Sequence, residues 1–319
     1  FNLETNMSNH SDVLIIGAGP SGAVAGALLN KQGFSVRILE RQVFPRFSIG
    51  ESLLAHCLDF LEEADMLRAV YQAGFQFKNG AAFARDGRYC DYNFAETFTD
   101  GFPATFQVQR APFDQLLADE ASRQGVDIRY QHEIIAADFT GEQPRLSAKN
   151  VNGEIEEFSA RFVLDASGFG RTLPRMLDLE TPSDFPVRRA VFTHIADHII
   201  AGEFDRQKIR VTVHPTKHDI WFWTIPFSNG RSSLGAVASS ERFAAYPGTP
   251  QEQLKALIAE TPCLAELLRN AVFDTPVNEL NGYSANVKTM HGNGFALLGN
   301  AAEFLDPVFS SGVTIALRS

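Results

Sequence analysis

The sequence is poor in cysteine and has no long apolar run. Its 319 residues include three cysteines, Cys57, Cys90 and Cys263, which are widely spaced and odd in number. This pattern argues against a disulfide framework or a cysteine metal site, and it favours buried thiols in a reducing compartment. No apolar stretch is long enough to span a membrane, and residues 1–10 contain no signal-peptide core. We therefore expect a cytoplasmic protein without a membrane span.

Positive charge is also scarce. The chain has 28 lysine and arginine residues against 38 aspartate and glutamate residues, a formal net charge of -10 at pH 7, and no basic cluster. These features argue against a nucleic-acid partner. The sequence has no internal repeats or low-complexity linkers, and its length suits one large domain or two intertwined ones.

The strongest motif is a dinucleotide-binding fingerprint near the N-terminus. A continuous apolar run, 13–16, is typical of a parallel strand buried on both faces. Gly17, Gly19 and Gly22 complete a G-x-G-x-x-G pattern, in which the glycines permit a tight turn, the approach of a pyrophosphate and close helix packing. Glu40 ends the next predicted strand 18 residues after Gly22 (40 − 22), near the spacing of an acid that binds ribose hydroxyls. The motif predicts FAD or NAD rather than NADP.

The rest of the chain alternates between helical and extended patterns. Thr249 and Thr261 each precede a proline, which predicts a threonine cap and a proline at the first helical position. In the strand predicted around Lys78, Phe75 and Phe77 share one face and the lysine points to the other. Helices are expected over 52–73 and 110–124, and from 250, 262 and 313 onward. Strands are expected over 13–16, 35–39, 75–83, 126–130, 133–139, 145–151, 155–158, 161–164, 190–195, 209–214, 220–226, 233–237, 283–287 and 295–298.

This order predicts an α/β (α+β) fold whose nucleotide-binding part is discontinuous. Its pieces are 11–51, 105–178 and 285–319, and the inserted pieces, 52–104 and 179–284, form a sheet over the cofactor. The sequence contains no second G-x-G-x-x-G pattern, so a separate NAD(P)H domain is not expected.

Several further motifs, spread over nearly the whole chain, narrow the function. They are Pro45-Arg46 with Gly50-Glu51-Ser52, Lys78, Asp165-Ala166-Ser167-Gly168, Trp221-Phe222-Trp223-Thr224-Ile225-Pro226, and the stretch from Phe304 to Gly312. With these motifs and the glycine fingerprint, the chain resembles an FAD-dependent halogenase of the tryptophan-halogenase superfamily. The glycine and D-A-S-G segments occur in many FAD enzymes, whereas W-x-W-x-I-P is more particular to halogenases.

The resemblance implies a Rossmann-like FAD-binding domain of the flavin monooxygenase (p-hydroxybenzoate hydroxylase-like) type with an inserted β-sheet substrate domain. It also implies a mechanism. FADH2 reacts with oxygen to give a hydroperoxide, and chloride or bromide attacks it to give hypohalous acid. This acid travels to a lysine, which positions it by a hydrogen bond or as a haloamine, and an electron-rich aromatic carbon takes the halogen.

The resemblance also assigns roles to single residues. Lys78 is the catalytic residue, and the N–H groups of Ser311 and Gly312 precede a helix and bind the halide. A contact of this pair with a flavin carbonyl, without halide, is an equal alternative. The expected barrier between flavin and substrate consists of Trp221, Trp223, Ile225, Pro226 and Phe309.

The expected FAD contacts come from four parts of the chain. Arg41 is assigned to the adenine, and Arg46 and Arg110 to the diphosphate because guanidinium suits phosphate. Asn300 stands where this fold usually has an aspartate, so this contact lacks the usual charge. The remaining expected contacts are Gly17, Gly19, Pro20, Ser21, Gly22, Glu40, Gly50, Glu51, Ser52, Asp165, Ala166, Gly168, Gly299, Pro307 and Gly312.

The expected substrate is a phenol or a pyrrole, free or attached to a carrier protein. Tryptophan halogenases carry a glutamate at the position of Phe309, where it steadies the cation formed on a moderately activated ring. Phenolate and pyrrole stabilise that cation themselves. A separate flavin reductase is expected as a partner. Family members also continue with helices over the substrate cavity, which we expect to be missing here.

Two other functions remain open from the sequence. The first is an FAD monooxygenase or FixC-like reductase that acts directly on its substrate. The second is a flavin-binding redox protein without turnover.

Overall fold

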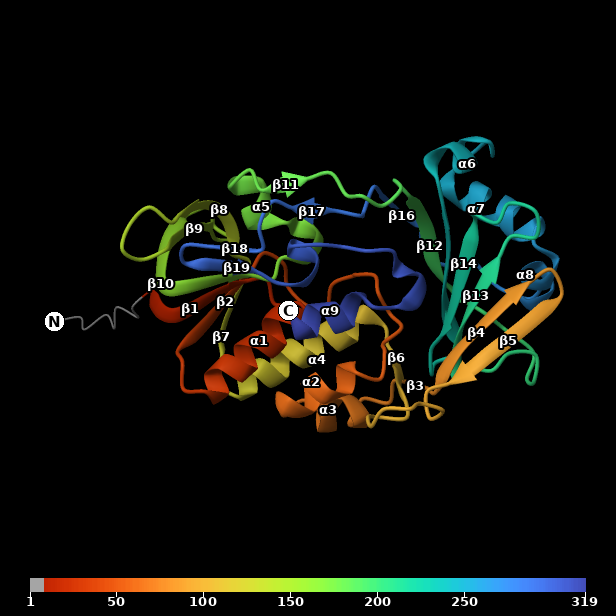
Figure 1. The fold of residues 1–319 in the computed structure, drawn as a ribbon, viewed down its shortest axis with the longest axis horizontal. Helices are drawn as coiled ribbons and strands as arrows, with labels where there is room; N and C mark the ends of the chain where they lie inside the picture. The colour runs from red at the N-terminus through yellow and green to blue at the C-terminus, as the bar shows by residue number, and fades with distance from the viewer. Residues whose placement is uncertain (1–8) are drawn as a thin grey trace.

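The computed structural model describes residues 9–319, in which two large sheets lie at opposite ends of the molecule (Figure 1). The core of the first sheet is parallel, in the order β19, β10, β1, β2, β7. A meander of β8 and β9 joins one end of β10, and β18 pairs with β19. The strands are β1 (His10–Ile16), β2 (Val36–Glu40), β7 (Asp127–Tyr130), β8 (Glu133–Asp138), β9 (Arg145–Lys149), β10 (Ile155–Asp165), β18 (His291–Gly292) and β19 (Phe295–Leu297).

The two strands predicted over 155–158 and 161–164 are one strand, β10. Its first residues pair antiparallel with β9, and its later residues pair parallel with β1 and β19. These partner strands come from distant parts of the chain, so the local sequence pattern did not reveal that β10 is one continuous strand.

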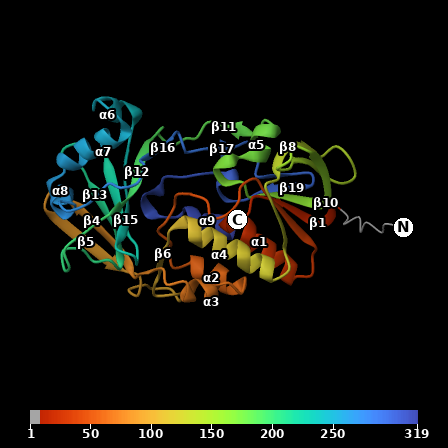
Figure 2. The same ribbon diagram turned by 180° about the vertical axis from the view of Figure 1, so that it is seen from behind.

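Helices α1 and α4 pack on one face of the first sheet, and α2, α3 and α9 pack against these two helices (Figures 1 and 2). Their apolar residues join the core through positions such as Val24, Leu61 and Phe113. The helices are α1 (Pro20–Lys31), α2 (Cys57–Glu63), α3 (Leu67–Gln72), α4 (Arg110–Arg123) and α9 (Gly312–Arg318). Helices α2 and α3 thus lie beside the nucleotide-binding layer, although we assigned 52–104 to the inserted sheet. The division of the chain into domains stays a prediction.

The predicted helix over 52–73 begins later and is interrupted. Ser52 forms a β-bridge with Gln107, and the Leu53 amide donates to the Phe106 carbonyl, so this stretch starts extended and passes through a turn at Ala55 and His56 before α2 begins at Cys57. Asp65, with φ of 56°, then separates α2 from α3. Pairing with a strand fifty residues away overrode the helical spacing of the apolar residues.

The second sheet is antiparallel except for one parallel pair, β13 and β4, and its order is β16, β12, β15, β14, β13, β4, β5. Three helices, α6 (Ser240–Ala244), α7 (Pro250–Ala259) and α8 (Pro262–Leu267), pack on its outer face. Its inner face turns toward the first sheet. The strands are β4 (Gly80–Arg85), β5 (Arg88–Asn93), β12 (Arg189–Ala196), β13 (Lys208–Val213), β14 (Trp221–Pro226), β15 (Arg231–Ala238) and β16 (Asn278–Asn281).

Two small ribbons bridge the halves, and both contain segments that we predicted as single strands. The strand predicted over 75–83 breaks at Asn79 into β3 (Gln76–Lys78), which pairs with β6 (Thr105–Gln107), and β4. The backbone of Asn79 bonds to Gln207 and Phe94 instead of continuing the ladder. The stretch predicted over 283–287 contributes β17 (Asn286–Val287), which pairs with β11 (Glu180–Thr181) and joins neither large sheet.

Two local expectations were partly wrong. Thr249 forms a capping box with Glu252, as expected, but the Thr261 hydroxyl donates to the Leu257 carbonyl and does not cap α8. Cys57 is buried, whereas Cys90 is exposed because it lies on the edge strand β5, and all three cysteines are free thiols.

Within residues 9–319, no helix is both long and apolar enough to cross a membrane.

Candidate functional site

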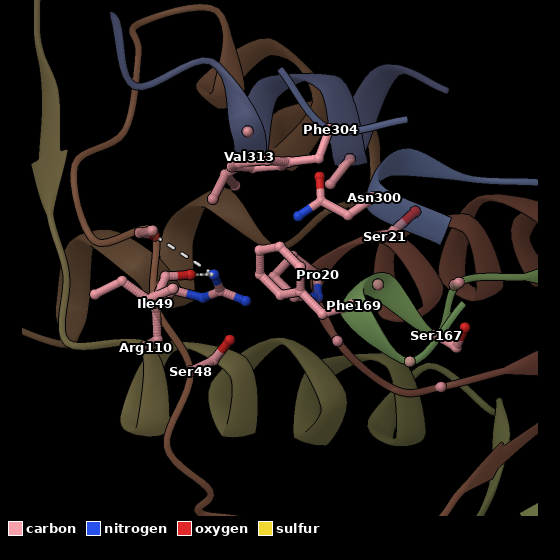
Figure 3. Close-up of a pocket in the computed structure, with 18 of the residues that line it drawn as sticks. Pro20, Ser21, Ser48, Ile49, Arg110, Ser167, Phe169, Asn300, Phe304 and Val313 are labelled. Carbon is pink, nitrogen blue, oxygen red and sulfur yellow. Dashed lines mark hydrogen bonds between the residues drawn. The ribbon is translucent and has the colours of Figure 1, made fainter. Parts of the chain in front are cut away.

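A cavity of about 440 Å³ lies between the carboxyl ends of the parallel strands and the inner face of the second sheet. This is where open α/β sheets bind their ligands, and the volume is in the usual range for small-molecule sites. Its walls come from the start of α1, the end of β2, the loop 41–52, the loop 166–172, the inner face of the second sheet and the segment 298–316. Figure 3 shows the part of the cavity around Pro20, Phe169 and Asn300.

The glycine fingerprint shapes the first wall as predicted. Gly17 has φ of 95°, and a Cβ there would lie 2.9 Å from the Ala166 carbonyl oxygen. A Cβ at Gly22 would lie 1.9 Å from the Gly17 oxygen, so Gly22 packs behind the cavity and does not line it. No side chain caps the start of α1, and the buried Ser21 hydroxyl has no partner among the described residues. The free N–H groups of this helix suit a diphosphate.

Glu40 is buried, lines this cavity and organises the neighbouring backbone. Its carboxylate accepts hydrogen bonds from the Ala18 amide at 2.9 Å and from the Gln42 amide at 2.8 Å. Each oxygen retains acceptor capacity, so a ribose contact stays a prediction. Arg41, the next residue, also lines the cavity.

Two arginines hold the loop 41–52 in place through one buried carboxylate. Arg110 binds Asp114 in a bidentate pair at 2.7 and 3.0 Å, and it donates to the Ile49 carbonyl at 2.6 Å (Figure 3). Arg46 reaches the same Asp114 at 3.2 Å. Both arginines line the cavity. Their contacts with Asp114 and the Ile49 carbonyl already explain where the two arginines lie. That either arginine binds phosphate stays a prediction.

Asp165 is buried behind the cavity instead of lining it. Its two oxygens accept hydrogen bonds from the amides of Ser167, at 2.9 Å, and Leu173, at 2.6 Å. Burial raises the pKa of this carboxyl, against these hydrogen bonds. Asp165 therefore shapes the loop whose members Ala166 and Gly168 do line the cavity. This loop leads through η1 (Gly168–Gly170) into α5 (Thr172–Met176).

One polar pair in the site was not foreseen. Glu51 is 1% exposed and lines the cavity, and its Oε1 lies 2.9 Å from Nε2 of His194 on β12. Its other oxygen, Oε2, has no partner among the described residues. The partners are 143 residues apart, and nothing in the local sequence around His194 marks it as a site residue.

The C-terminal segment closes the cavity from another side. Asn300 lines the cavity, with its amide directed inward (Figure 3). Gly299 has φ of 51° and packs against Ala316 of α9 instead of lining the cavity. Helix α9 begins at Gly312, one residue earlier than predicted, and no side chain caps it. Gly312 and Pro307 line the cavity whereas Ser311 does not. The short turns here are η2 (Gly299–Ala301) and η3 (Pro307–Phe309).

The two tryptophans share the inner face of β14, as predicted. Their ring centroids lie 6.1 Å apart, and both rings and Ile225 line the cavity. Trp223 donates to the Ser233 hydroxyl at 3.0 Å. Its ring lies over Gly235, where a Cβ would approach it to 2.2 Å, so the ring position requires a glycine on β15.

The remaining two expected barrier residues lie elsewhere. Pro226 ends β14 and does not line the cavity. Phe309 is 67% exposed and lines a second, much smaller cavity. That second cavity also contains Lys78, and it shares Ile209, Val308 and Ser310 with the first. The Lys78 cavity and the main cavity therefore have a common wall.

Lys78 is an amine held in an apolar environment. It is 1% exposed, whereas its neighbour Phe77 is 44% exposed, so the two side chains do point to opposite faces. Its Nζ donates to the Leu53 carbonyl at 2.6 Å and lies 5.1 Å from the centroid of the Phe94 ring. Burial lowers the pKa of Lys78 to about 7, which makes a substantial neutral fraction available near neutral pH.

Replacing Lys78 by methionine is expected to remove a pH dependence from the folding stability. Because burial lowers its pKa from 10.5 to about 7, the unfolded chain binds more protons than the folded chain between these values. The folded state therefore gains stability as the pH rises through that window. Between pH 7 and 8.5, wild type should gain roughly 1.5 kcal/mol over Lys78→Met. Urea denaturation at both pH values measures this, and equal pH profiles would contradict it.

The fold and this cavity define a dinucleotide-binding flavoprotein. The comparisons with known proteins agree: residues 10–316 match the family described as FAD binding domain, and the chain belongs to that family. It is an FAD-dependent oxidoreductase related to the halogenases and monooxygenases.

Curated relatives include several halogenases. The chain is 29% identical to a 1H-pyrrole-2-carbonyl-[peptidyl-carrier protein] chlorinase of Pseudomonas fluorescens, over 98% of this chain and 75% of the relative. It is 28% identical to a tryptophan 2-halogenase of Chondromyces crocatus, over 98% of this chain. The chain spans 60% of the length of the latter.

Solved structures share the fold. A flavoprotein/dehydrogenase from Cytophaga hutchinsonii is 46% identical, with a TM-score of 0.92 over 97% of this chain and 75% of that chain. The myxobacterial chondrochloren halogenase, an FAD-dependent halogenase, is 31% identical, with a TM-score of 0.88 over 97% of this chain and 72% of that chain. The chain is thus homologous to flavin-dependent halogenases and has their mixed α/β fold.

The residues around the cavity fit FAD. Four buried polar atoms on residues that line it have no hydrogen-bond partner in the described part of the chain: Ser21 Oγ, Glu51 Oε2, Ser52 Oγ and Tyr283 Oη. Buried polar atoms without partners are rare and costly. The phosphates, ribityl hydroxyls and ring N–H groups of FAD offer both the donors and the acceptors that these atoms need.

Proposed function

We propose that the protein is a flavin-dependent halogenase that uses reduced FAD, oxygen and chloride or bromide to halogenate an electron-rich aromatic. The observation that carries this proposal is Lys78, a fully buried amine whose small cavity shares a wall with the main cavity. A buried lysine without a carboxylate partner is costly to keep, and within residues 9–319 the contacts of this amine are a carbonyl oxygen and a ring face.

In this proposal, the chain separates the formation of the oxidant from its use. Bound reduced FAD supplies the electrons that activate oxygen for the oxidation of halide. Lys78, with a pKa of about 7, can hold the hypohalous acid by a hydrogen bond or take its halogen as a haloamine. Both forms place the electrophilic halogen at Nζ, outside the main cavity.

The rings of Trp221 and Trp223 serve as the barrier. They close the main cavity on the side of the second sheet, so an aromatic substrate has no direct access to the cofactor through that side. Small hypohalous acid can pass where a ring cannot. The N–H groups at the start of α9, at Ser311 and Gly312, are the proposed halide contact, and a flavin carbonyl remains the alternative occupant.

The proposed substrate is a phenol or a pyrrole, free or tethered to a carrier protein. Phe309 supplies no carboxylate near Lys78, and a phenolate or pyrrole needs none because it stabilises its own cation. One of the relatives is named for a carrier-bound pyrrole. A separate flavin reductase is the proposed source of reduced FAD, since the sequence has one dinucleotide fingerprint.

A second candidate function is direct oxidation or reduction of a substrate without halide. The similarity to a flavoprotein/dehydrogenase at 46% identity favours it. An enzyme with this function would use the same FAD cavity. This function, however, gives no role to the buried amine of Lys78.

The deciding experiment supplies the protein with FAD, NADH, a separate flavin reductase, oxygen and bromide, together with simple phenols and pyrroles, free and carrier-bound. Mass spectrometry should find a brominated product that requires both bromide and the reductase. Catalase is added so that free peroxide cannot brominate the substrate. An oxygenated or dehydrogenated product that forms equally without halide would establish the second candidate and overturn the first.

A further inference from the structure

The pair formed by Glu51 and His194 connects the loop 41–52 to the second sheet. The Nε2 atom of His194, on β12, lies 2.9 Å from Oε1 of Glu51. A carboxylate only accepts hydrogen bonds, so the imidazole is the donor in this pair. The backbone of Glu51 is held as well, because its carbonyl accepts a hydrogen bond from the Val108 amide at 2.8 Å. Backbone and side chain are thus fixed by separate partners, which holds the carboxylate in one orientation.

This arrangement leaves one oxygen of a buried carboxylate unused by the protein. Glu51 is 1% exposed, and its Oε2 has no hydrogen-bond partner among residues 9–319. Glu51 lines the main cavity, whereas His194 does not. A buried carboxylate oxygen without a donor is costly. The site therefore suits a ligand that brings a hydroxyl or an N–H group to Oε2.

The surroundings of the pair show which end of a dinucleotide lies beside it. The ring of His194 lies 5.9 Å from that of Phe47, centroid to centroid, and Phe47 stacks on Phe192 of β12 at 6.1 Å. Both phenylalanines line the main cavity. The glycine turn and Glu40, which suit a diphosphate and a ribose, belong to the first sheet. A dinucleotide that binds there with its adenosine half directs its other half toward these aromatic rings and Glu51.

We propose that Glu51 accepts a hydrogen bond from the flavin half of FAD, and that His194 is the positioning residue for this contact. The first sheet then recognises the adenosine half, and the second sheet acts through His194 to orient the acceptor for the flavin half. The inference concerns cofactor binding alone, so it does not depend on halogenation.

The test titrates the protein, freed of cofactor, with FAD and separately with ADP, which fills only the adenosine half. Glu51→Gln keeps the shape of the side chain and the bond from His194, but it replaces the second oxygen by an amide nitrogen that cannot accept. FAD affinity should fall by about tenfold or more, the scale of one hydrogen bond to a charged group. ADP affinity should not change.

Two variants of His194 test its positioning role. His194→Leu removes the donor and should lower FAD affinity by a factor similar to that of Glu51→Gln. His194→Gln places an amide nitrogen close to the position of Nε2, so it should restore most of the affinity. The double variant Glu51→Gln/His194→Leu should bind FAD no more weakly than Glu51→Gln, because both residues act through one contact.

His214→Leu is the matched control. His214 is also buried, and its Nε2 lies 3.2 Å from Oε2 of Glu260, but neither residue lines either cavity. This variant loses a histidine–carboxylate pair of the same kind and should bind FAD as wild type does.

Thermal unfolding of each cofactor-free protein separates recognition from a structural role. Unchanged FAD affinity in Glu51→Gln would overturn the inference. So would an equal loss of FAD and ADP affinity together with a lower unfolding temperature, because the pair would then only join the loop to the sheet. If His194→Leu does not fold, Glu51→Gln and His194→Gln still decide the matter. These titrations contain no halide or substrate, so a failed bromination assay counts against the proposed function and leaves their result unchanged.

Discussion

Replacing Lys78 by methionine is expected to abolish halogenation while leaving the reoxidation of bound reduced flavin by oxygen intact. Methionine has a similar length and no donor, so it fills the same buried site without holding the halogen species. Because the oxidant is generated in the main cavity and Lys78 lies across its wall, only the later step should fail. A loss of roughly 10³-fold matches the scale of a positioned proton donor or acceptor. Product formation by mass spectrometry and flavin absorbance by stopped flow measure the two steps separately.

Lys208→Met provides the matched control. Lys208 is also a buried lysine, on β13, where it pairs with Gly80 of β4, but its Nζ is bound to Asp205 at 2.7 Å and to the Asn79 side chain at 3.2 Å. It lies in neither cavity lining. The control should retain halogenation per folded molecule. Normal halogenation by Lys78→Met would reduce Lys78 to a structural residue and would remove the main support for the proposed function.

The substitution Gly22→Ala is expected to destabilise the protein and prevent FAD binding. Its new Cβ would lie 1.9 Å from the Gly17 carbonyl oxygen and 3.3 Å from the Ala166 Cβ. The contact is with backbone, which cannot rotate away as a side chain could. The turn that we propose binds the diphosphate must therefore move away from α1, at a cost of about 3 kcal/mol. Urea denaturation and titration with FAD, followed by flavin fluorescence, measure both effects.

Gly141→Ala is a suitable control for the added methyl group. Gly141 lies in a loop between β8 and β9, its φ is not positive, and a Cβ there would meet nothing nearer than the Gln143 oxygen at 3.8 Å. Its effect should stay within about 0.5 kcal/mol. FAD binding by Gly22→Ala with the affinity of wild type would show that the turn tolerates displacement, contrary to this expectation.

Some features of the site depend on residues that are close in the sequence, and others depend on residues that are far apart. The glycine turn that begins α1 and, outside the site, the capping box at Thr249 follow from short sequence patterns and were predictable, although Gly17 also packs against the distant Ala166. The pairing of Glu51 with His194 and the burial of Lys78 depend on segments brought together from far apart. A lysine on a short strand is usually solvated, so without the family resemblance its burial would not have been expected.

The sequence by itself determined the nucleotide-binding unit. Its strand, glycine turn, helix and terminal acid are one contiguous stretch, and each step follows from local sterics and hydrogen bonding. Tertiary structure alone decided where extended segments stop, as at Asn79, and which strand they join, as in β10. It also decided that Asp165 supports a loop behind the cavity and that Phe309 faces the Lys78 cavity. The physical reason is that burial and pairing are set by partners distant in sequence, whose positions no local pattern records.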